Sequence, residues 1–158
     1  MSFLVIFLLV IGFLFTLAFF TKRRFGVLGM ALAAGAMLSM LWVGDLTPII
    51  ASAGIIIVKP PLGSVVSAGL ILAPALILLA SGPTYKTMRQ RIIGATAFAI
   101  LAISLLLEPL GSALVIDGIG RTVYDFFVKY HAVIITAALG FALLDLLVTK
   151  TPRAHKEH

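Results

Sequence analysis

Long apolar runs separated by short polar segments extend along the whole chain. A helix needs about 20 apolar residues to cross the roughly 30 Å hydrocarbon core of a bilayer, because it rises about 1.5 Å per residue. Four runs meet this length, and a shorter fifth run is closed by Glu108 and Pro109. The pattern therefore predicts an all-α, polytopic membrane protein with five transmembrane helices. The predicted spans are 2–21, 26–44, 63–82, 92–108 and 132–149.

The segment 47–58 between the second and third runs is too short to span a membrane. Thr47 can cap a helix whose first residue is Pro48, and the residues 59–61, with two prolines, end it. We expect a short interfacial or re-entrant helix here. A strand over the run 54–58 is the alternative, because periodicity does not separate the two in so short a segment.

The segment 119–131 has the pattern of an amphipathic helix. Its apolar residues follow helical spacing, and its charged residues recur every four positions on another face. The pattern predicts a second short helix, lying in the membrane plane with aromatic side chains at headgroup depth. The residues that we assign to this interfacial helix are Arg121, Tyr124, Asp125, Phe127 and Lys129.

Composition supports a membrane environment. Hydrophobic residues make up 61% of the 158 positions and charged residues only 11%, whereas a soluble domain carries about a quarter charged residues. The mean hydropathy is +1.19. The chain has no cysteine, which excludes disulfides, thiolate metal sites and cysteine-based enzymes.

Nine of the twelve cations lie in alternate loops and in the tail. This distribution predicts the orientation of the chain in the membrane. By the positive-inside rule these segments face the cytoplasm of a bacterial inner membrane, with the N-terminus outside and the C-terminus inside. The opposite side carries four acids against three bases. We expect the first run to be retained as a signal anchor. The nine cations are Lys22, Arg23, Arg24, Lys86, Arg89, Arg91, Lys150, Arg153 and Lys156.

The net charge of +6 therefore comes mainly from these nine cations, which form a basic collar at one membrane surface. We expect anionic lipid headgroups to contact its loop residues, Lys22 to Arg24 and Lys86 to Arg91. Nucleic acid is not an expected partner, because the cations are dispersed and lack interleaved aromatic residues.

The second span carries small residues at four-residue spacing: Ala31, Gly35 and Ser39. Such a stripe allows another helix backbone to approach closely. We expect it to pack within this chain, and a contact between copies is the alternative. Pro74 in the third span removes one backbone hydrogen bond and predicts a kink.

No catalytic set, cofactor site or metal site emerges from the sequence. The pairs Tyr124-Asp125 and Gly44-Asp45 suggest an intramembrane aspartyl protease, but Trp42 replaces a required glycine and the order of the two motifs is reversed. The histidines at 131, 155 and 158 lack the spacing and companions of a zinc site. We therefore expect a protein that is not an enzyme.

Asp145 is the one ionisable residue inside a predicted span. It lies four residues, or roughly 6 Å, inside the end of the fifth span, and such a carboxylate is a functional candidate by default. The alternatives are ion coupling and a structural role, in which it snorkels, pairs with the basic collar or bonds across helices. We favour the structural role.

The order of these features resembles that of the colicin V production (CvpA-type) family of small bacterial inner-membrane proteins. The resemblance covers about residues 1–131 and includes the basic turn "KRRFG", the run "VLGMALAAGAMLSMLW" and the turn "MRQRIIGA". The chain departs from the family's Arg-Gly turn by having Phe25 between Arg24 and Gly26. The resemblance implies an accessory role in export or envelope maintenance, without a known reaction.

These observations predict one transmembrane domain over 1–149 and a short basic cytoplasmic tail over 150–158. We expect a non-enzymatic scaffold or accessory subunit that contacts the lipid bilayer and either a membrane-protein partner or another copy of itself. The alternative is a small transporter or channel subunit that uses Asp145 and the kink at Pro74.

Overall fold

The computed structural model describes residues 3–54, 60–114, 116 and 118–148, and these residues form five α-helices without a β-strand. Each helix is long and apolar enough to cross a membrane. The expected all-α, five-span fold is therefore confirmed, and the protein is a multi-pass membrane protein. The helices are α1 (Phe3–Thr21), α2 (Phe25–Ser52), α3 (Leu62–Ser81), α4 (Met88–Ala113) and α5 (Ile119–Val148).

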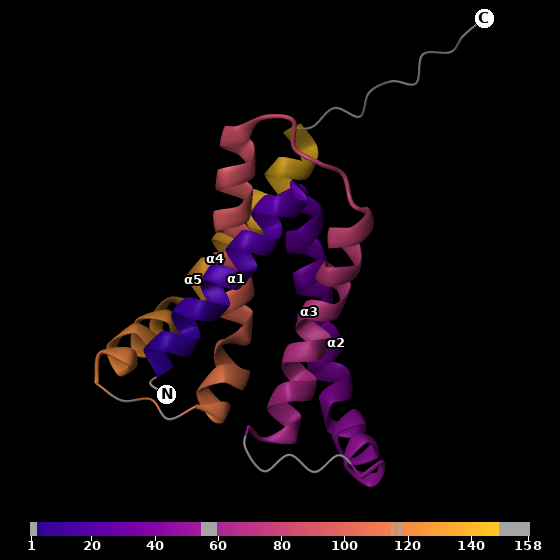
Figure 1. Cartoon of the computed structure of the whole chain (residues 1–158), viewed down its shortest axis with the longest axis vertical. Coiled ribbons are helices and arrows are strands. Elements are labelled where there is room, and N and C mark those ends of the chain that lie inside the picture. The colour runs from indigo at the N-terminus through magenta and orange to yellow at the C-terminus, as the bar shows by residue number, and fades with distance from the viewer. Residues whose placement is uncertain (1–2, 55–59, 115, 117, 149–158) are drawn as a thin grey trace, which may run out of the picture.

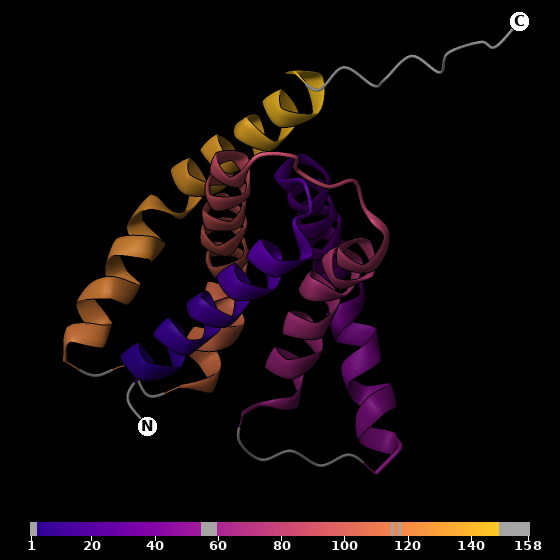
Figure 2. The same ribbon diagram turned by 45° about the horizontal axis from the view of Figure 1, so that its top comes forward.

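The helices form two groups that meet at one end of the molecule and diverge toward the other (Figures 1 and 2). One group is α2 with α3, and the other is α1, α4 and α5. The loops α1–α2 and α3–α4 and the end of α5 lie where the groups meet, which we call the basic end. The opposite end, with the connections α2–α3 and α4–α5, is the far end.

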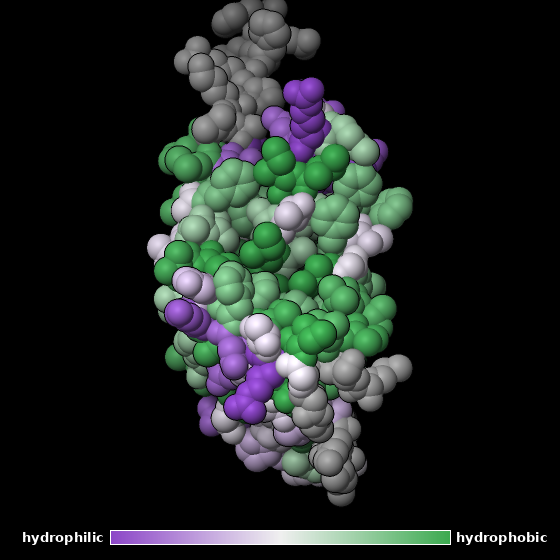
Figure 3. Space-filling model, turned by 90° about the vertical axis from the view of Figure 1, so that its left-hand side faces the viewer, coloured by the Kyte–Doolittle hydropathy of each residue, from purple (hydrophilic) through white to green (hydrophobic). Residues whose placement is uncertain are grey.

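The surface between the two ends is apolar. Figure 3 shows apolar residues across the middle of one side, with hydrophilic residues gathered toward its ends. Large side chains such as Leu9, Phe13 and Leu147 are 62%, 64% and 78% exposed. Residues of this kind are stable at a surface only when lipid or another apolar chain covers them.

The short helix expected over 47–58 is not present as a separate element. Residues up to Ser52 continue α2, and the Thr47 hydroxyl donates to the Val43 carbonyl at 2.6 Å instead of capping a new helix. Pro48 deprives the helix of only one hydrogen bond, to Gly44. Extending an existing helix also avoids the cost of nucleating another. Residues 55–59 lie outside the described part of the chain.

The in-plane helix expected over 119–131 is also wrong, because this segment and the fifth span form one continuous helix, α5. Part of its apolar face packs against protein, whereas Ile119, Phe126 and Tyr130 are exposed. The Phe127 ring lies 5.4 Å from the Phe7 ring, and the Tyr124 ring fits against Gly111. No proline or glycine lies between 120 and 140 to interrupt the backbone.

The charged row on this part of α5 is oriented as its spacing predicts. Arg121 and Asp125 form an ion pair of 4.0 Å on the exposed face, and the Lys129 ammonium lies 5.6 Å from the Tyr130 ring. α4 likewise exceeds its expected span, because it continues beyond Glu108 and Pro109 to Ala113.

α2 packs closely against α3 at Gly35. Ala31, Gly35 and Ser39 are all buried. A methyl group at Gly35 would meet the carbonyl oxygens of Ile71 and Leu70, the latter at 2.8 Å. Pro74 has no N–H, so it leaves the Leu70 carbonyl without its helical donor. The absence of a side chain at Gly35 therefore lets the backbone of α2 approach the carbonyls of α3 around this position.

The same helix approaches α5 near the basic end. Added methyl groups would lie 2.8 Å from the Ala142 carbonyl at Gly26, and 2.9 Å from the Ala142 side chain at Gly29. α2 therefore contacts α3 and α5 through glycines at different heights.

The close approach at Gly35 predicts that Gly35→Ala destabilises the protein by about 1–3 kcal/mol, because the methyl group must push α3 away. Gly140→Ala in α5 is the matched control, since nothing lies within 4 Å of that site. There alanine should be neutral or stabilising by up to about 1 kcal/mol. Unfolding in mixed micelles with increasing SDS measures both effects, and equal free energies for the two variants would contradict this packing.

Candidate functional site

The two loops of the basic end are hydrogen-bonded to each other. The Arg24 N–H donates to the Pro83 carbonyl at 3.0 Å, and the Tyr85 N–H donates to the Lys22 carbonyl at 2.7 Å. Lys22 takes a positive φ of 57° to make this turn. These bonds hold the connection between α1 and α2 against the connection between α3 and α4.

Arginine side chains from these loops bind the carbonyl ends of other helices. The guanidinium of Arg23 donates to the carbonyls of Leu79, Ala80 and Gly82 at the end of α3. The last carbonyls of a helix lack helical donors and carry partial negative charge. An arginine there both donates hydrogen bonds to these carbonyls and offsets their charge. We call such contacts arginine clamps.

Two further arginine clamps act on α1 and α5. Arg91 donates to the Phe19 carbonyl at 2.9 Å, and its guanidinium carbon lies 4.6 Å from the centre of the Phe19 ring. Arg24 donates to the Asp145 carbonyl at 2.9 Å. Three of the six loop cations that we expected at lipid headgroups are thus half-buried and bound to protein, whereas Lys22, Lys86 and Arg89 are exposed.

The amino end of α2 is capped by side chains from elsewhere in the chain. The Phe25 N–H donates to the Tyr85 hydroxyl at 3.0 Å, and the Gly26 N–H donates to the Asp145 carboxylate at 2.9 Å. The side chain of the N-cap residue, Arg24, makes no such bond. Asp145 therefore satisfies a free donor and places its negative charge at the positive end of the helix dipole.

Tyr85 reaches this position because α4 presents Gly94 beside it. A methyl group at Gly94 would lie 2.5 Å from the Tyr85 ring. Burial raises the pKa of Tyr85 from 10.0 to about 12; the nearby Asp145 carboxylate adds to this shift and the bond from Phe25 opposes it. The hydroxyl therefore stays neutral to a higher pH than that of an exposed tyrosine.

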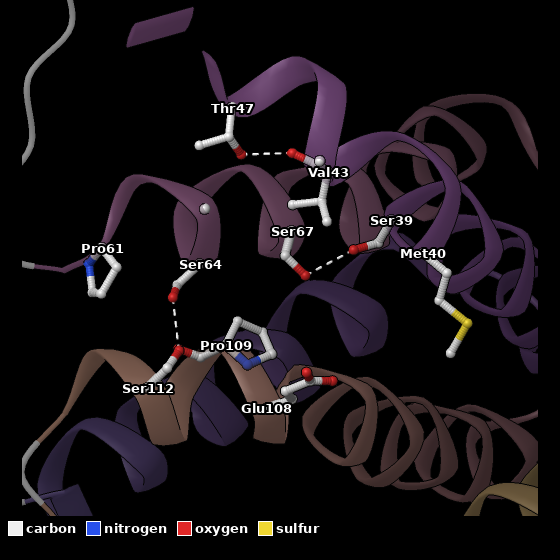
Figure 4. A pocket seen from close by; sticks show the side chains of 12 residues that line it. Ser39, Met40, Val43, Thr47, Pro61, Ser64, Ser67, Glu108, Pro109 and Ser112 are labelled. Carbon is white, nitrogen blue, oxygen red and sulfur yellow. Dashed lines mark hydrogen bonds between the residues drawn. The ribbon is translucent and has the colours of Figure 1, made fainter.

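An open cavity of about 470 Å³ with a mixed wall lies between α2, α3 and α4, on the side of the far end (Figure 4). Its wall combines hydroxyl groups, apolar side chains and one carboxylate. The lining residues are Ser39, Met40, Val43, Gly44, Thr47, Pro61, Gly63, Ser64, Ser67, Glu108, Pro109 and Ser112.

Two serine pairs connect the helices around the cavity. The hydroxyl oxygens of Ser39 and Ser67 are 2.7 Å apart and link α2 to α3, and those of Ser64 and Ser112, also 2.7 Å apart, link α3 to α4. Figure 4 shows both pairs along the wall. These bonds fix the spacing of the three helices where the cavity forms.

Among the residues that the structure describes, Glu108 supplies the only charge in this lining. It lies five residues before the end of α4, roughly 7.5 Å along the helix axis. Its side chain is exposed, and no lysine or arginine of the described residues forms an ion pair with it. An acid at this depth is expensive in lipid unless water, a proton or a cation accompanies it.

The sequence pattern does not predict this cavity, because in it Glu108 marks only the end of a span. A weak signal was present. Ser64 and Ser67 are three residues apart and Glu108 and Ser112 are four apart, so each pair shares one helix face. What could not be read from spacing is that these two faces meet.

The other sequence-based candidates do not form a reactive site in the described part of the chain. Within it, no three histidine, aspartate or glutamate residues gather to hold a metal ion. Asp45 and Asp125, the aspartates of the protease-like motifs, are both exposed.

Comparison of the chain with protein-family models, curated proteins and solved structures finds no match. The resemblance to the colicin V production family therefore stays a prediction. The geometry of the basic end and of the cavity is the basis for assigning a function.

The raised pKa of Tyr85 predicts a loss of stability at high pH. A pKa that is higher in the folded protein gives a contribution that is complete below the unfolded value of 10.0 and is lost as pH rises through about 12. The unfolding free energy should therefore fall between pH 10 and about 12, and this fall should be smaller in Tyr85→Phe.

Tyr130→Phe is the control, because the Tyr130 ring is exposed. The unfolding free energy of this variant should fall with pH as that of the wild type does. The same pH dependence in all three proteins would show that Tyr85 is not buried as described.

Proposed function

We propose that this protein is a non-enzymatic scaffold or accessory subunit of an export- or envelope-related complex in the bacterial inner membrane. The observation that carries the proposal is the position of Asp145. Its carboxylate accepts a hydrogen bond from Gly26, and its own carbonyl accepts one from Arg24. A carboxylate used in this way holds α5 against the start of α2.

Ion coupling would require the same carboxylate to change its charge during a transport cycle. Loss of that charge would remove a favourable interaction with the dipole of α2, worth about 0.3–1 kcal/mol and up to about 2 kcal/mol in a partly buried site. The contacts of Asp145 thus support a structural role over ion coupling.

A partner surface is available on α2. Met37, Met40, Leu41 and Trp42 are 64%, 80%, 71% and 51% exposed. Methionine adapts its shape to different partners, and tryptophan provides a large contact area. This surface supports the expected contact with another membrane protein or a second copy, in addition to lipid.

The second candidate is a small transporter or channel subunit. It is favoured by the hydroxyl groups and the carboxylate in the cavity wall, since a passage for a polar solute needs polar groups inside the bilayer. The acid that lines this cavity is Glu108, so the site differs from the Asp145 site expected from the sequence.

The proposed orientation places the basic end in the cytoplasm and the far end outside. Reporter fusions after residues 24, 91 and 158 should report a cytoplasmic location, and fusions after 59 and 117 the opposite side, because nine of the twelve cations favour retention inside. A fusion in loop 22–24 or 86–91 that reports the outside would contradict the orientation.

The structural role of Asp145 predicts that Asp145→Asn lowers the unfolding free energy by about 0.3–2 kcal/mol. Asp125→Asn, on the exposed face of the same helix, should change it by less than about 0.5 kcal/mol. Proteoliposomes with wild type and Asp145→Asn should show no difference in pH-driven flux. A flux present in wild type and absent in Asp145→Asn, with folding intact, would replace the scaffold with the transporter.

A further inference from the structure

We propose that the cavity between α2, α3 and α4 binds an organic cation with an ammonium group, and that Glu108 is its counter-charge. This site is separate from the scaffold role and does not depend on it. The ammonium could belong to a free amine or to a lipid headgroup such as that of phosphatidylethanolamine. Both sources present the same N–H donors and the same charge.

The charge of the cavity selects a cation. Glu108 is the single charged residue among the described residues of the lining, and the described cations of the far end are engaged elsewhere. Arg121 pairs with Asp125, and the Lys129 ammonium lies over the Tyr130 ring. A carboxylate at this depth gains most from a ligand that brings a positive charge.

The hydroxyl groups of the wall mainly offer acceptors. Ser112 donates to the Pro109 carbonyl at 3.1 Å, so in the Ser64–Ser112 pair Ser64 is the donor and keeps its lone pairs free. The Thr47 hydroxyl donates to the Val43 carbonyl and likewise keeps its lone pairs. The Ser39–Ser67 pair uses one of its two hydroxyl hydrogens and also keeps lone pairs. A wall that offers more free acceptors than free donors suits an ammonium group, which has three donors and no acceptor.

The size of the cavity suits a small organic molecule better than a bare metal ion. Its volume of about 470 Å³ lies within the range of about 300–1,000 Å³ that is typical of small-molecule sites. Metal ions need several oxygen ligands within about 2.6 Å, whereas only one carboxylate lines this space. Met40, Val43 and Pro109 add apolar contacts for the carbon atoms of an organic ligand.

An apolar groove adjoins the cavity. It has a volume of about 290 Å³ and shares Ser64 and Pro109 with the cavity. Its remaining wall includes Val10, Leu72 and Leu106. An acyl chain would lie in this groove if the ammonium belongs to a lipid. The two sources can therefore be distinguished by comparing an amine that carries acyl chains with one that does not.

The test is calorimetric titration of the whole chain in nanodiscs of phosphatidylcholine and phosphatidylglycerol, which contain no primary amine. The probes are ethanolamine and dihexanoyl-phosphatidylethanolamine. Dihexanoyl-phosphatidylcholine is the matched control, because its headgroup carries the same phosphate and a positively charged nitrogen but has no N–H donor. At least one primary amine should bind, and the phosphatidylcholine should bind at least tenfold more weakly.

Glu108→Gln should weaken binding of the amine at least tenfold, because the amide keeps the shape and loses the charge. Ser64→Ala should weaken it several-fold, whereas Asp45→Asn, an exposed acid on α2, should leave it unchanged. Lys59 lies outside the described residues. The same probes are therefore also titrated into the Lys59→Gln variant.

Tighter binding of the phosphatidylethanolamine than of ethanolamine supports the lipid source, and equal binding supports the free amine. The proposal is overturned if neither amine binds wild type or Lys59→Gln, or if a well-folded Glu108→Gln binds as wild type does.

Discussion

The hydrogen bonds that side chains make to the ends of helices are the interaction on which this structure depends. In a bilayer, a backbone group without a partner costs several kcal/mol, and each helix leaves four such groups at either end. The arginine clamps of Arg23, Arg24 and Arg91 serve the ends of α3, α5 and α1. Tyr85 and Asp145 serve the start of α2. Every helix therefore has an end or a loop tied into the basic end.

This arrangement explains why the two ends of the bundle differ. At the basic end, arginine side chains bind backbone carbonyls, and backbone hydrogen bonds join the two loops. At the far end the two groups of helices diverge (Figure 2), and serine pairs link α2, α3 and α4 around the open cavity. The molecule thus combines a tightly bonded end with an end that leaves Glu108 available to a ligand.

The number, type and approximate position of the spans were predictable, because about 20 apolar residues between charges have few alternatives in lipid. The helix ends were not, since the turn-like "GDLTP" at 44–48 continues α2 and the amphipathic segment 119–131 is part of α5. The reasons are tertiary: Phe7 and Gly111 receive the aromatic face of α5. Sequence spacing placed the cations in two loops but could not show that half of them bind carbonyls, or that Glu108 and the serines share a cavity.

The central claim is tested most directly by amide hydrogen exchange of the protein in bilayers, resolved by residue at the start of α2. The first amides of a helix normally exchange rapidly because they lack helical acceptors. The tertiary cap predicts slow exchange at Phe25 and Gly26, with Tyr85→Phe releasing mainly Phe25 and Asp145→Leu mainly Gly26. Rapid exchange of both amides in the wild type would contradict the account.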